Sequence, residues 1–449
     1  MSALIPGAGQ LYLGYRRRGL VLLGLALLPL AFAGILVLRG GSMVGLVLQP
    51  SFLGALLVVN GLLAAFRLFA VFDAYHLGRA GRPTRLPAWA RVPLAAMLLL
   101  GLAAVTVAPH AIVGYYNAQA YQTVNDIFGG GAGLAGQLPG WSGPKANASP
   151  RKTAIPKPER FNVLLLGGDA GARRVGLRTD TMIVASVDPA SRRVALISVP
   201  RNLTHVPLVG KARDAFPCHC FPDLLNALYR YAQANPRYFP EGPDRGAMAV
   251  TRAVENLVKL KIDEYVLVDM RGFVDVVDAL GGVTVRVTEH VNFRLTSPTS
   301  GRQWPLVDLP PGRYHFDGLH ALAYVRSRSA DDDYHRMRRQ RCMLAGLAGQ
   351  ANLSNVLRAL PRLLQAARRS VSTNVPQSQL PQLAVLASRM RGAHVTTLGL
   401  GPPRYSGRDA HHLPIPLIPQ IRAGVQQALR GDQPVSQQDG ETLKGGNCV

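Results

Sequence analysis

The stretch FNVLLLGGD (Phe161–Asp169) has the pattern of a buried strand that ends in two glycines and an acid. TMIVASV (Thr181–Val187) and RVALISV (Arg193–Val199) follow as further strands, and DPASR between them predicts a tight turn with proline at its second position. Apolar runs bounded by turn residues are typical of strands inside a sheet. These segments therefore predict the centre of a β-sheet.

Helical segments alternate with the strands. AMAVTRAVENLVKL (Ala247–Leu260) has apolar residues at helical spacing, and FVDVVDAL predicts a short helix between the strands EYVLVDM and GVTVRV. Such alternation predicts an α/β fold, a three-layer α/β/α sandwich around a mixed β-sheet. We expect this domain to occupy residues 161–350, with a helical continuation over 351–430 and a flexible tail over 431–449.

The N-terminal part, residues 1–115, predicts an α-helical membrane region. Three segments are apolar over about the thickness of a bilayer core: Leu20–Leu38, Ser51–Phe72 and Val92–Val113. Three transmembrane helices are therefore predicted, and the alternatives are two spans with a re-entrant segment or a removable signal peptide. Residues 116–160, rich in Gly, Pro, Ala and Ser, predict a linker.

Arginines orient the spans. Arg16, Arg17 and Arg18 precede the first span and four arginines lie between the second and third, whereas only Arg39 lies between the first two. The positive-inside rule then predicts a multi-pass protein of the cell membrane with a cytoplasmic N-terminus and everything after about residue 115 extracytoplasmic. Of the formal net charge of +24, +16 lies beyond residue 110. A basic domain there meets membrane lipid, anionic wall polymers and lipid-linked phosphates, and we expect no nucleic acid partner.

Charged side chains stand at the ends of the predicted strands. Asp169 follows the first strand and Asp180 precedes the second, and open α/β sheets place ligand sites in such loops. Two carboxylates at neighbouring strand ends could hold a hard cation such as Mg²⁺ against a phosphate. Arg201 follows the third strand, where it can reach a ligand over the edge of the sheet.

The segment YVRSRSADDDYHRMRRQR (Tyr324–Arg341) contains six arginines. ALAYVRSR alternates, which predicts a strand with Arg326 and Arg328 on one face. Beyond Asp333 the pattern predicts a helix on which Arg336, Arg339 and Gln340 share a face, while Arg338 and Arg341 point elsewhere. Guanidinium groups that converge in this way match the oxygens of a phosphate.

These motifs, in this order, resemble the LytR-CpsA-Psr family of bacterial cell-envelope proteins. The resemblance rests on NVLLLGGD, RTDTMIVASVDPASRRVALISVPRNL, DEYVLVDMRGFVDVVDALGGVTVRV, FDGLHALAYVRSR and DYHRMRRQR, and it covers about residues 160–350. It implies a Mg²⁺-dependent, membrane-anchored extracytoplasmic phosphotransferase that serves cell wall biogenesis. Such an enzyme moves a glycopolymer from a polyprenyl-pyrophosphate carrier to a peptidoglycan hydroxyl and forms a phosphodiester.

The resemblance also assigns roles to residues. Asp169 and Asp180 match the acidic, Mg²⁺-associated positions, and Arg201 matches the arginine of the family's PRD motif. The substrate-binding set for the pyrophosphate is Arg178, Arg326, Arg328, Arg336, Arg339 and Gln340. We place Asp169, Asp180 and Arg201 at the catalytic centre, because phosphoryl transfer needs mainly positioning and charge stabilisation. Either aspartate could accept the proton of the attacking hydroxyl.

Three positions depart from the family pattern. Asn202 replaces the aspartate after the arginine of the PRD motif, Gly171 stands where an arginine is common, and LLNALY (Leu224–Tyr229) lacks the lysine of the usual KINxAY. The alternative function is therefore a non-catalytic envelope protein that binds lipid-linked or wall polymers, or a signalling or regulatory attenuator. The sequence does not name the polymer.

The cysteines are Cys218, Cys220, Cys342 and Cys448. Outside the membrane a disulfide can persist. Residues separated by one position are poorly placed to bridge each other, so we expect Cys342 to pair with Cys218 or Cys220.

Overall fold

A computed structural model describes most of the chain. The described residues are 1–38, 50–80, 88–128, 160–170, 176–240, 242, 244–327, 333–350, 359, 362–363, 365–366, 370–376, 379–390, 392–431 and 442–443. They form two compact units, Met1–Gln122 with Leu380–Val385, and Thr123–Gln379 with Leu386–Val449. Each unit is described by itself.

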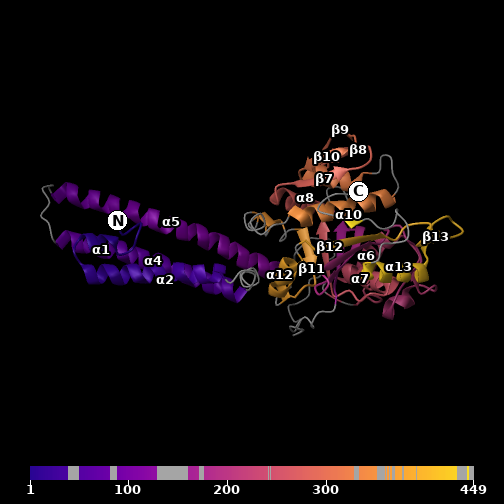
Figure 1. Cartoon of the computed structure of the whole chain (residues 1–449), viewed down its shortest axis with the longest axis horizontal. Coiled ribbons are helices and arrows are strands. Elements are labelled where there is room, and N and C mark those ends of the chain that lie inside the picture. The colour runs from indigo at the N-terminus through magenta and orange to yellow at the C-terminus, as the bar shows by residue number, and fades with distance from the viewer. Residues whose placement is uncertain are drawn as a thin grey trace. The chain divides into compact units, whose positions relative to one another are not determined.

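The N-terminal unit is helical (Figure 1). Its helices are α1 (Ala8–Tyr12), α2 (Arg16–Leu38), α4 (Pro50–Ala80) and α5 (Ala88–Phe128). Many large apolar side chains on them are exposed, among them Leu62, Leu98 and Leu100. Within the described part of the chain, two stretches are long and apolar enough to cross a membrane, Ser51–Arg79 and Ala96–Gln122. The helix α2 covers the first predicted span, which stays a prediction.

Helices α4 and α5 are joined by hydrogen bonds at two levels, and at the first of these the His110 ring Nδ1 also bonds the Asn60 Oδ1 (2.9 Å). The Asn60 Nδ2 donates to the carbonyl oxygen of His110 (2.8 Å), and the Asn117 Nδ2 donates to that of Leu53 (2.9 Å). Leu53 and Asn60 are seven residues apart on α4, and their partners Asn117 and His110 are seven residues apart on α5 in the opposite order. The two levels therefore define one antiparallel register. Amide groups that bond across helices in this way hold apolar helices together where the hydrophobic effect does not.

The predicted start of the linker at residue 116 is wrong. Helix α5 continues to Phe128, because NAQAYQTVNDIF (117–128) contains neither glycine nor proline and the glycine-rich run begins only at Gly129. The rest of the predicted linker, up to residue 159, lies outside the described residues.

The second unit is built on a mixed seven-stranded sheet, with the order β11-β6-β1-β2-β3-β12-β15. Its strands are β1 (Phe161–Gly168), β2 (Thr179–Asp188), β3 (Arg193–Ser198), β6 (Glu264–Asp269), β11 (Val371–Thr373), β12 (His394–Gly399) and β15 (Thr442–Leu443). Strands β1, β2 and β3 form the predicted antiparallel centre, and Asp188 closes the β2–β3 turn by accepting from the backbone of Ala190 and Ser191. Parallel pairing with β6 and β12 makes the sheet mixed.

Helices cover both faces of this sheet, which confirms the three-layer α/β/α fold. The helices α6 (Leu228–Ala234), α7 (Arg245–Val258) and α13 (Ile418–Arg430) pack against one face. Alternate residues of β1, such as Leu164 and Leu166, enter that core. The opposite face is covered by α8 (Met270–Ala279), α9 (Gly318–Arg326) and α10 (Asp333–Gln350).

A smaller second core lies beyond α8, α9 and α10. It contains β7 (Val283–Val287), β8 (Val291–Thr296), β9 (Gln303–Leu309) and β10 (Gly312–Phe316), which pair as β10–β7 and β8–β9. Phe293, Phe316 and Tyr324 are among its buried side chains. Figure 1 shows these strands next to α8 and α10.

Two local predictions are corrected. ALAYVRSR is not a strand up to Arg326, because it forms the end of α9: the Asp317 side chain caps this helix by accepting from the His320 amide, and Leu322 and Val325 are buried at helical spacing. The continuation over 351–430 is not only helical. Besides α12 (Leu380–Arg389) and α13 it supplies the sheet strands β11 and β12, and the pair β13 (Ser406–Arg408) and β14 (Pro414–Pro416).

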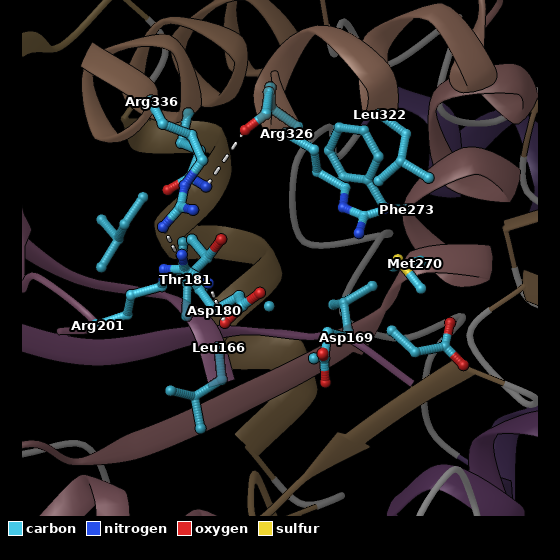
Figure 2. Close-up of a pocket in the computed structure, with 18 of the residues that line it drawn as sticks. Leu166, Asp169, Asp180, Thr181, Arg201, Met270, Phe273, Leu322, Arg326 and Arg336 are labelled. Atoms are coloured by element: carbon cyan, nitrogen blue, oxygen red, sulfur yellow. Dashed lines mark hydrogen bonds and ion pairs between the residues drawn. The ribbon is translucent and has the colours of Figure 1, made fainter. Parts of the chain in front are cut away.

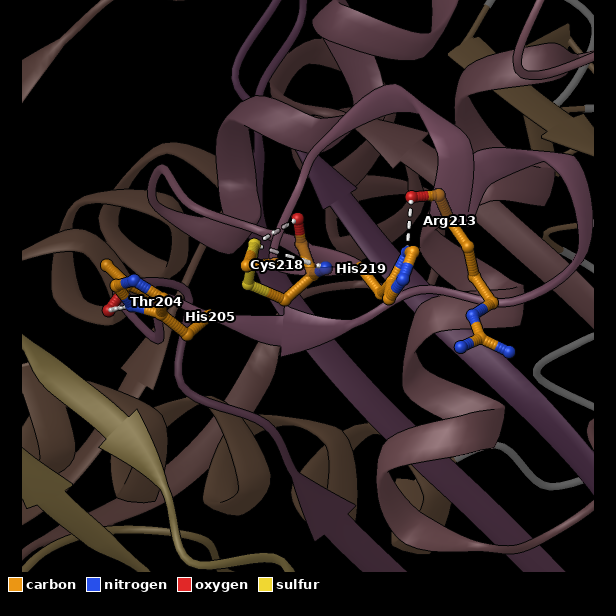
Figure 3. The surroundings of a disulfide bond; sticks show 6 residues. Thr204, His205, Arg213, Cys218 and His219 are labelled. Carbon is orange, nitrogen blue, oxygen red and sulfur yellow. Dashed lines mark hydrogen bonds between the residues drawn. A yellow bond between two sulfur atoms is a disulfide. The ribbon is translucent and has the colours of Figure 1, made fainter.

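The cysteine prediction is also wrong, because Cys218 and Cys220 form a disulfide with each other (Figure 3). Between them His219 takes a left-handed backbone conformation (φ 52°), which folds the chain back and brings the two Cα atoms to 5.1 Å. The bridge lies at the start of β5 (Cys220–Phe221), which pairs with β4 (Val206–Pro207). Pairing of Cys342 with either residue is thereby excluded.

Candidate functional site

The main cavity of the described residues lies between the sheet and helices α8, α9 and α10. It has a volume of about 820 Å³. Its charged and polar lining residues, which we call the mouth, include Asp169, Arg178, Asp180, Arg201, Asn226, Arg326, Arg336 and Gln340, and apolar residues, which we call the chamber, line most of the rest. Figure 2 shows Asp180, Arg201 and Arg336 together on one side and Met270, Phe273 and Leu322 on the other. The cavity therefore joins an anion-binding mouth to an apolar chamber.

The two predicted aspartates both line this mouth. The Asp169 carboxylate is buried, and its Oδ1 accepts from the backbone amide of Arg178 (2.8 Å), while the Asp169 amide donates to the Arg178 carbonyl (3.0 Å). Asp180 is the second residue of β2, opposite the irregularity in β1 between Gly167 and Gly168. The end of β1 and the start of β2 thus bring both carboxylates to one edge of the sheet.

Asp180 is bound by an arginine and an amide. The Arg201 Nη1 donates to Asp180 Oδ1 (2.8 Å), and the Asn226 Nδ2 donates to the same oxygen (2.9 Å). Burial alone would raise the pKa of the Asp180 carboxyl, but these hydrogen bonds and the charges of Arg201 and Arg336 outweigh it and lower the pKa below the ordinary value. Asp180 is therefore ionised at neutral pH and is a weak proton acceptor.

A third carboxylate, that of Asp333, was not among the predicted site residues. Arg201 donates to it from Nε (3.1 Å) and Nη2 (3.3 Å), and the Arg336 Nη1 lies 3.0 Å from its Oδ1. Asp333 stands in the first turn of α10, where a negative charge is favourable. One acid therefore binds the guanidinium groups of both Arg201 and Arg336.

The predicted helix over the arginine segment is confirmed as α10, and its side chains separate into three groups. Arg336 and Gln340 line the cavity. Arg339 is buried beneath it, where its Nη2 donates to the Ser327 carbonyl (2.8 Å) and its guanidinium lies 5.9 Å from the centre of the Tyr324 ring. Arg341 is also buried, with its guanidinium next to Gly399 of β12.

The remaining predicted ligands of the pyrophosphate come from other elements. Arg326 ends α9 and lines the cavity, and Arg178 lines it from the residue before β2. Arg328 lies outside the described residues. The structure thus brings Arg178, Arg201, Arg326 and Arg336 to one cavity, whereas Arg339 supports the backbone that follows Arg326.

The apolar chamber is made by residues that a sequence pattern does not single out. Its walls are Leu165, Ile183, Val266 and Val268 from the sheet, Phe273 and Val276 from α8, Leu322 and Val325 from α9, and Met343, Leu344 and Leu347 from α10. On β1, Leu165 lines this cavity and Leu164 is buried in the opposite core, whereas Leu166 belongs to that core and also lines the cavity. An apolar cavity of this size suits a hydrocarbon chain.

The two predicted magnesium ligands, Asp169 and Asp180, both line the cavity, and the ion itself stays a prediction. Both present carboxylate oxygens to the mouth, and the described residues contain no cluster of three or more His, Cys, Asp or Glu that could hold a metal ion by itself. Mg²⁺ typically binds one or two protein carboxylates and completes its shell with water and substrate phosphate. Two carboxylates in one cavity are donors of the kind that such an ion uses.

Sequence reasoning missed Asn226, Asp269 and Asp333, which all lie at the mouth or contact it. Asn226 belongs to the LLNALY motif. Its side-chain amide donates a hydrogen bond to Asp180, which gives that motif a physical role. Asp269 caps α8 by accepting from the Gly272 amide (2.7 Å), and burial raises the pKa of its carboxyl. Asn202 also lines the cavity, and among the described residues its buried Oδ1 has no hydrogen-bond partner.

The fold and this cavity define a class of protein, a three-layer α/β domain with an arginine- and aspartate-lined mouth on an apolar chamber. The LytR_cpsA_psr family model matches residues 142–403, more than half of the chain. The chain belongs to the LytR-CpsA-Psr family.

Characterised relatives share about a quarter to a third of their residues with the matched part. The chain is 28% identical over 228 residues to polyisoprenyl-teichoic acid–peptidoglycan teichoic acid transferase TagU of Bacillus anthracis, which covers 50% of this chain and 64% of that protein. It is 30% identical over 232 residues to TagU of Enterococcus faecalis (51% and 65%), and 28% identical over 241 residues to biofilm regulatory protein A of Streptococcus mutans (52% and 54%). The match thus spans less than two thirds of these relatives.

Two solved structures are also similar. TagV of B. subtilis aligns with a TM-score of 0.44 and 24% identity, over 62% of this chain and 99% of that chain. TagT bound to LIIa-WTA aligns with a TM-score of 0.42 and 20% identity, over 61% and 90%.

Proposed function

We propose that this protein is a membrane-anchored, extracytoplasmic phosphotransferase. It would move a glycopolymer from a polyprenyl-pyrophosphate carrier to a peptidoglycan hydroxyl and leave a phosphodiester. One observation carries this proposal: a single cavity combines an apolar chamber with a mouth of four arginines and two aspartates. A polyprenyl pyrophosphate has the same two parts, a hydrocarbon chain and a doubly charged headgroup. The names of the teichoic acid transferases that the chain resembles support the same reaction class.

In this proposal the arginines and the aspartates of the mouth have different roles because they carry opposite charges. Arg201, Arg326 and Arg336 would bind the pyrophosphate oxygens and stabilise the charge that develops when the bond to the leaving phosphate breaks. Asp169 and Asp180 would hold Mg²⁺, which supplies charge neutralisation for the phosphates when it is bound. No step needs a covalent intermediate, because the acceptor hydroxyl can attack a phosphorus atom held in line.

The proton of the attacking hydroxyl needs an acceptor. Asp180 is the weaker of the two predicted candidates, because its lowered pKa leaves it little affinity for a proton. We therefore assign the proton to Asp169. Because no acid follows Arg201 in this chain, Asn202 could only orient a group by donating from its amide or accepting at Oδ1.

The test uses the full chain in detergent with a synthetic polyprenyl-pyrophosphoryl disaccharide, peptidoglycan oligomers and Mg²⁺. Release of polyprenyl phosphate and formation of a disaccharide–peptidoglycan phosphodiester are followed in the wild type, Asp180→Ala, Arg336→Ala and the surface control Asp214→Ala. Turnover in the wild type and the control, lost in the other two, is the expected result.

Tight binding of the lipid without turnover in the wild type would contradict the transferase. It would favour the second candidate, a polymer-binding envelope protein. The observation behind that candidate is Asn202, an amide in the cavity where the family has an acid.

A further inference from the structure

A second, smaller cavity adjoins the mouth of the first. It has a volume of about 340 Å³, and its lining residues are Asn292, Phe293, Arg294, Thr296, Leu306, Leu322, Ala323, Arg326 and Ser327. Leu322 and Arg326 line both cavities. The last turn of α9 therefore lies against both cavities, and Arg326 contributes to each lining.

The second cavity is lined by polar and apolar side chains in nearly equal number. In β8 the residues Val291, Phe293 and Leu295 are buried in the smaller core, so Asn292, Arg294 and Thr296 form a row on the other side of the strand. This row offers an amide, a guanidinium and a hydroxyl. Leu306, which pairs with Arg294 across the β8–β9 ladder and is 56% exposed, adds an apolar surface beside the row.

The walls of this second cavity are tied to the arginine helix. The Ser327 Oγ donates to the Asn292 carbonyl (2.7 Å), which joins the end of α9 to β8. The Ser327 carbonyl accepts from Arg339 of α10 (2.8 Å). The row on β8 is thus held at a fixed position relative to Arg326 and Arg336, as a binding site that acts together with the mouth requires.

The second cavity shares Arg326 with the mouth and Leu322 with the chamber wall. In a lipid-linked saccharide the sugar is joined directly to the pyrophosphate, so a pyrophosphate held by Arg326 would place the sugar next to this second cavity. Sugars are bound by hydrogen-bonding groups for their hydroxyls together with an apolar surface for their C–H faces, and the second cavity presents both. We propose that this cavity binds the saccharide joined to the pyrophosphate, with Asn292, Arg294 and Thr296 contacting its polar groups. This inference rests on the proposed function and adds the site of its glycan.

The experiment compares two probes on the full chain in detergent. Farnesyl pyrophosphate carries the lipid and the headgroup, and farnesyl pyrophosphoryl disaccharide adds the sugars. Affinities for both are measured by calorimetry in the wild type, in Arg294→Ala/Thr296→Val and in Thr296→Val alone. The control is Arg286→Ala, which removes an exposed arginine from β7 of the same core and outside the cavity.

The double variant is expected to lose at least tenfold in affinity for the saccharide-bearing probe and less than twofold for farnesyl pyrophosphate. Thr296→Val, which changes no charge, is expected to lose less affinity than the double variant, and again only for the saccharide-bearing probe. Arg286→Ala is expected to bind both probes as the wild type does.

Two results would overturn the proposal while leaving the phosphotransferase intact. Equal losses for both probes would mean that Arg294 only adds positive charge near the headgroup. Unchanged affinity for both probes would place the sugar elsewhere. A wild type that binds neither probe would overturn the proposed function itself, and this inference with it.

Discussion

The Nε of Arg201 lies 3.1 Å from the Oδ2 of Asp333, so the guanidinium that we assign to a phosphate is already bound to a carboxylate. Asp333 also contacts Arg336, and Arg201 contacts Asp180 as well. Two of the cavity's arginines are thereby kept in place and partly neutralised before any substrate arrives. A pyrophosphate must compete with this internal acid for the same donors.

Removing the charge of Asp333 should strengthen anion binding. Asp333→Asn is expected to bind inorganic pyrophosphate about five- to tenfold more tightly, because two guanidinium groups lose a competing partner. Calorimetry at constant ionic strength measures this, with Asp275→Asn, which breaks the exposed pair with Arg271, as the control. Weaker binding in Asp333→Asn would show instead that the acid aligns the arginines for the ligand.

Removal of divalent cations should stop the reaction without unfolding the protein. A chelator is expected to abolish release of polyprenyl phosphate, and Mg²⁺ to restore it, because the ion offsets phosphate charge between Asp169 and Asp180. Asp169→Asn should need a higher Mg²⁺ concentration for half-maximal rate. Full activity in the presence of chelator would remove the metal from the proposal, whatever the variant does.

Filling the apolar chamber should affect long lipids only. Val266 lies on β6 with its side chain in the chamber wall. Val266→Trp is expected to lower affinity for farnesyl pyrophosphate at least tenfold and to leave inorganic pyrophosphate within twofold, since the mouth is untouched. Val266→Ala, which enlarges the chamber, is the matched control. A Trp variant that binds both ligands as the wild type does would mean that the lipid lies outside this chamber.

The stability of the sheet should fall as the pH rises from about 4.5 to about 7. Burial, and then the neighbouring charge of Asp263, raises the pKa of Glu264 at the start of β6 to about 7. The folded state then holds a proton that the unfolded chain has lost, so stability is complete below the unfolded pKa and declines up to the folded one. Glu264→Gln should reduce the change in the free energy of unfolding across this pH range by about 1–2 kcal/mol.

Thermal unfolding of the wild type and Glu264→Gln at pH 5 and pH 8 tests this. The variant should be the more stable protein at pH 8 and nearly equal at pH 5. Parallel curves for the two proteins across this range would show that Glu264 does not titrate as expected.

The sequence predicted the features that depend on local pattern. Apolar runs bounded by turn residues located β1, β2 and β3, and the helical spacing beyond Asp333 located α10 with Arg336 and Gln340 on the cavity side. Period-two and 3.6-residue patterns are set by which side chains are buried, so they can be read from a single chain. The fold class and the cluster of arginines and aspartates followed from these.

What could not be predicted depends on tertiary contacts. ALAYVRSR alternates like a strand, but the Asp317 cap and the burial of Leu322 and Val325 select a helix. In the sequence Asp333 is one of three consecutive aspartates, which a pattern interprets as solvated acids. The fold places its Oδ2 3.1 Å from the Nε of Arg201, more than a hundred positions away in sequence. The Cys218–Cys220 bridge depends on the left-handed conformation of His219, which histidine adopts more often than most residues but still only in a minority of cases.

The four strands that carry the mouth and part of the chamber wall, β6, β1, β2 and β3, all come from before residue 270, but both of their outer neighbours come from after residue 370. A chain cut at residue 350 would keep most cavity residues yet leave β6 and β3 as bare edges, each with a row of unpaired backbone groups. Exposed strand edges of this kind form backbone hydrogen bonds with strands of other chains. We therefore expect that fragment to form insoluble aggregates, and the smallest soluble piece of the domain to extend past β12.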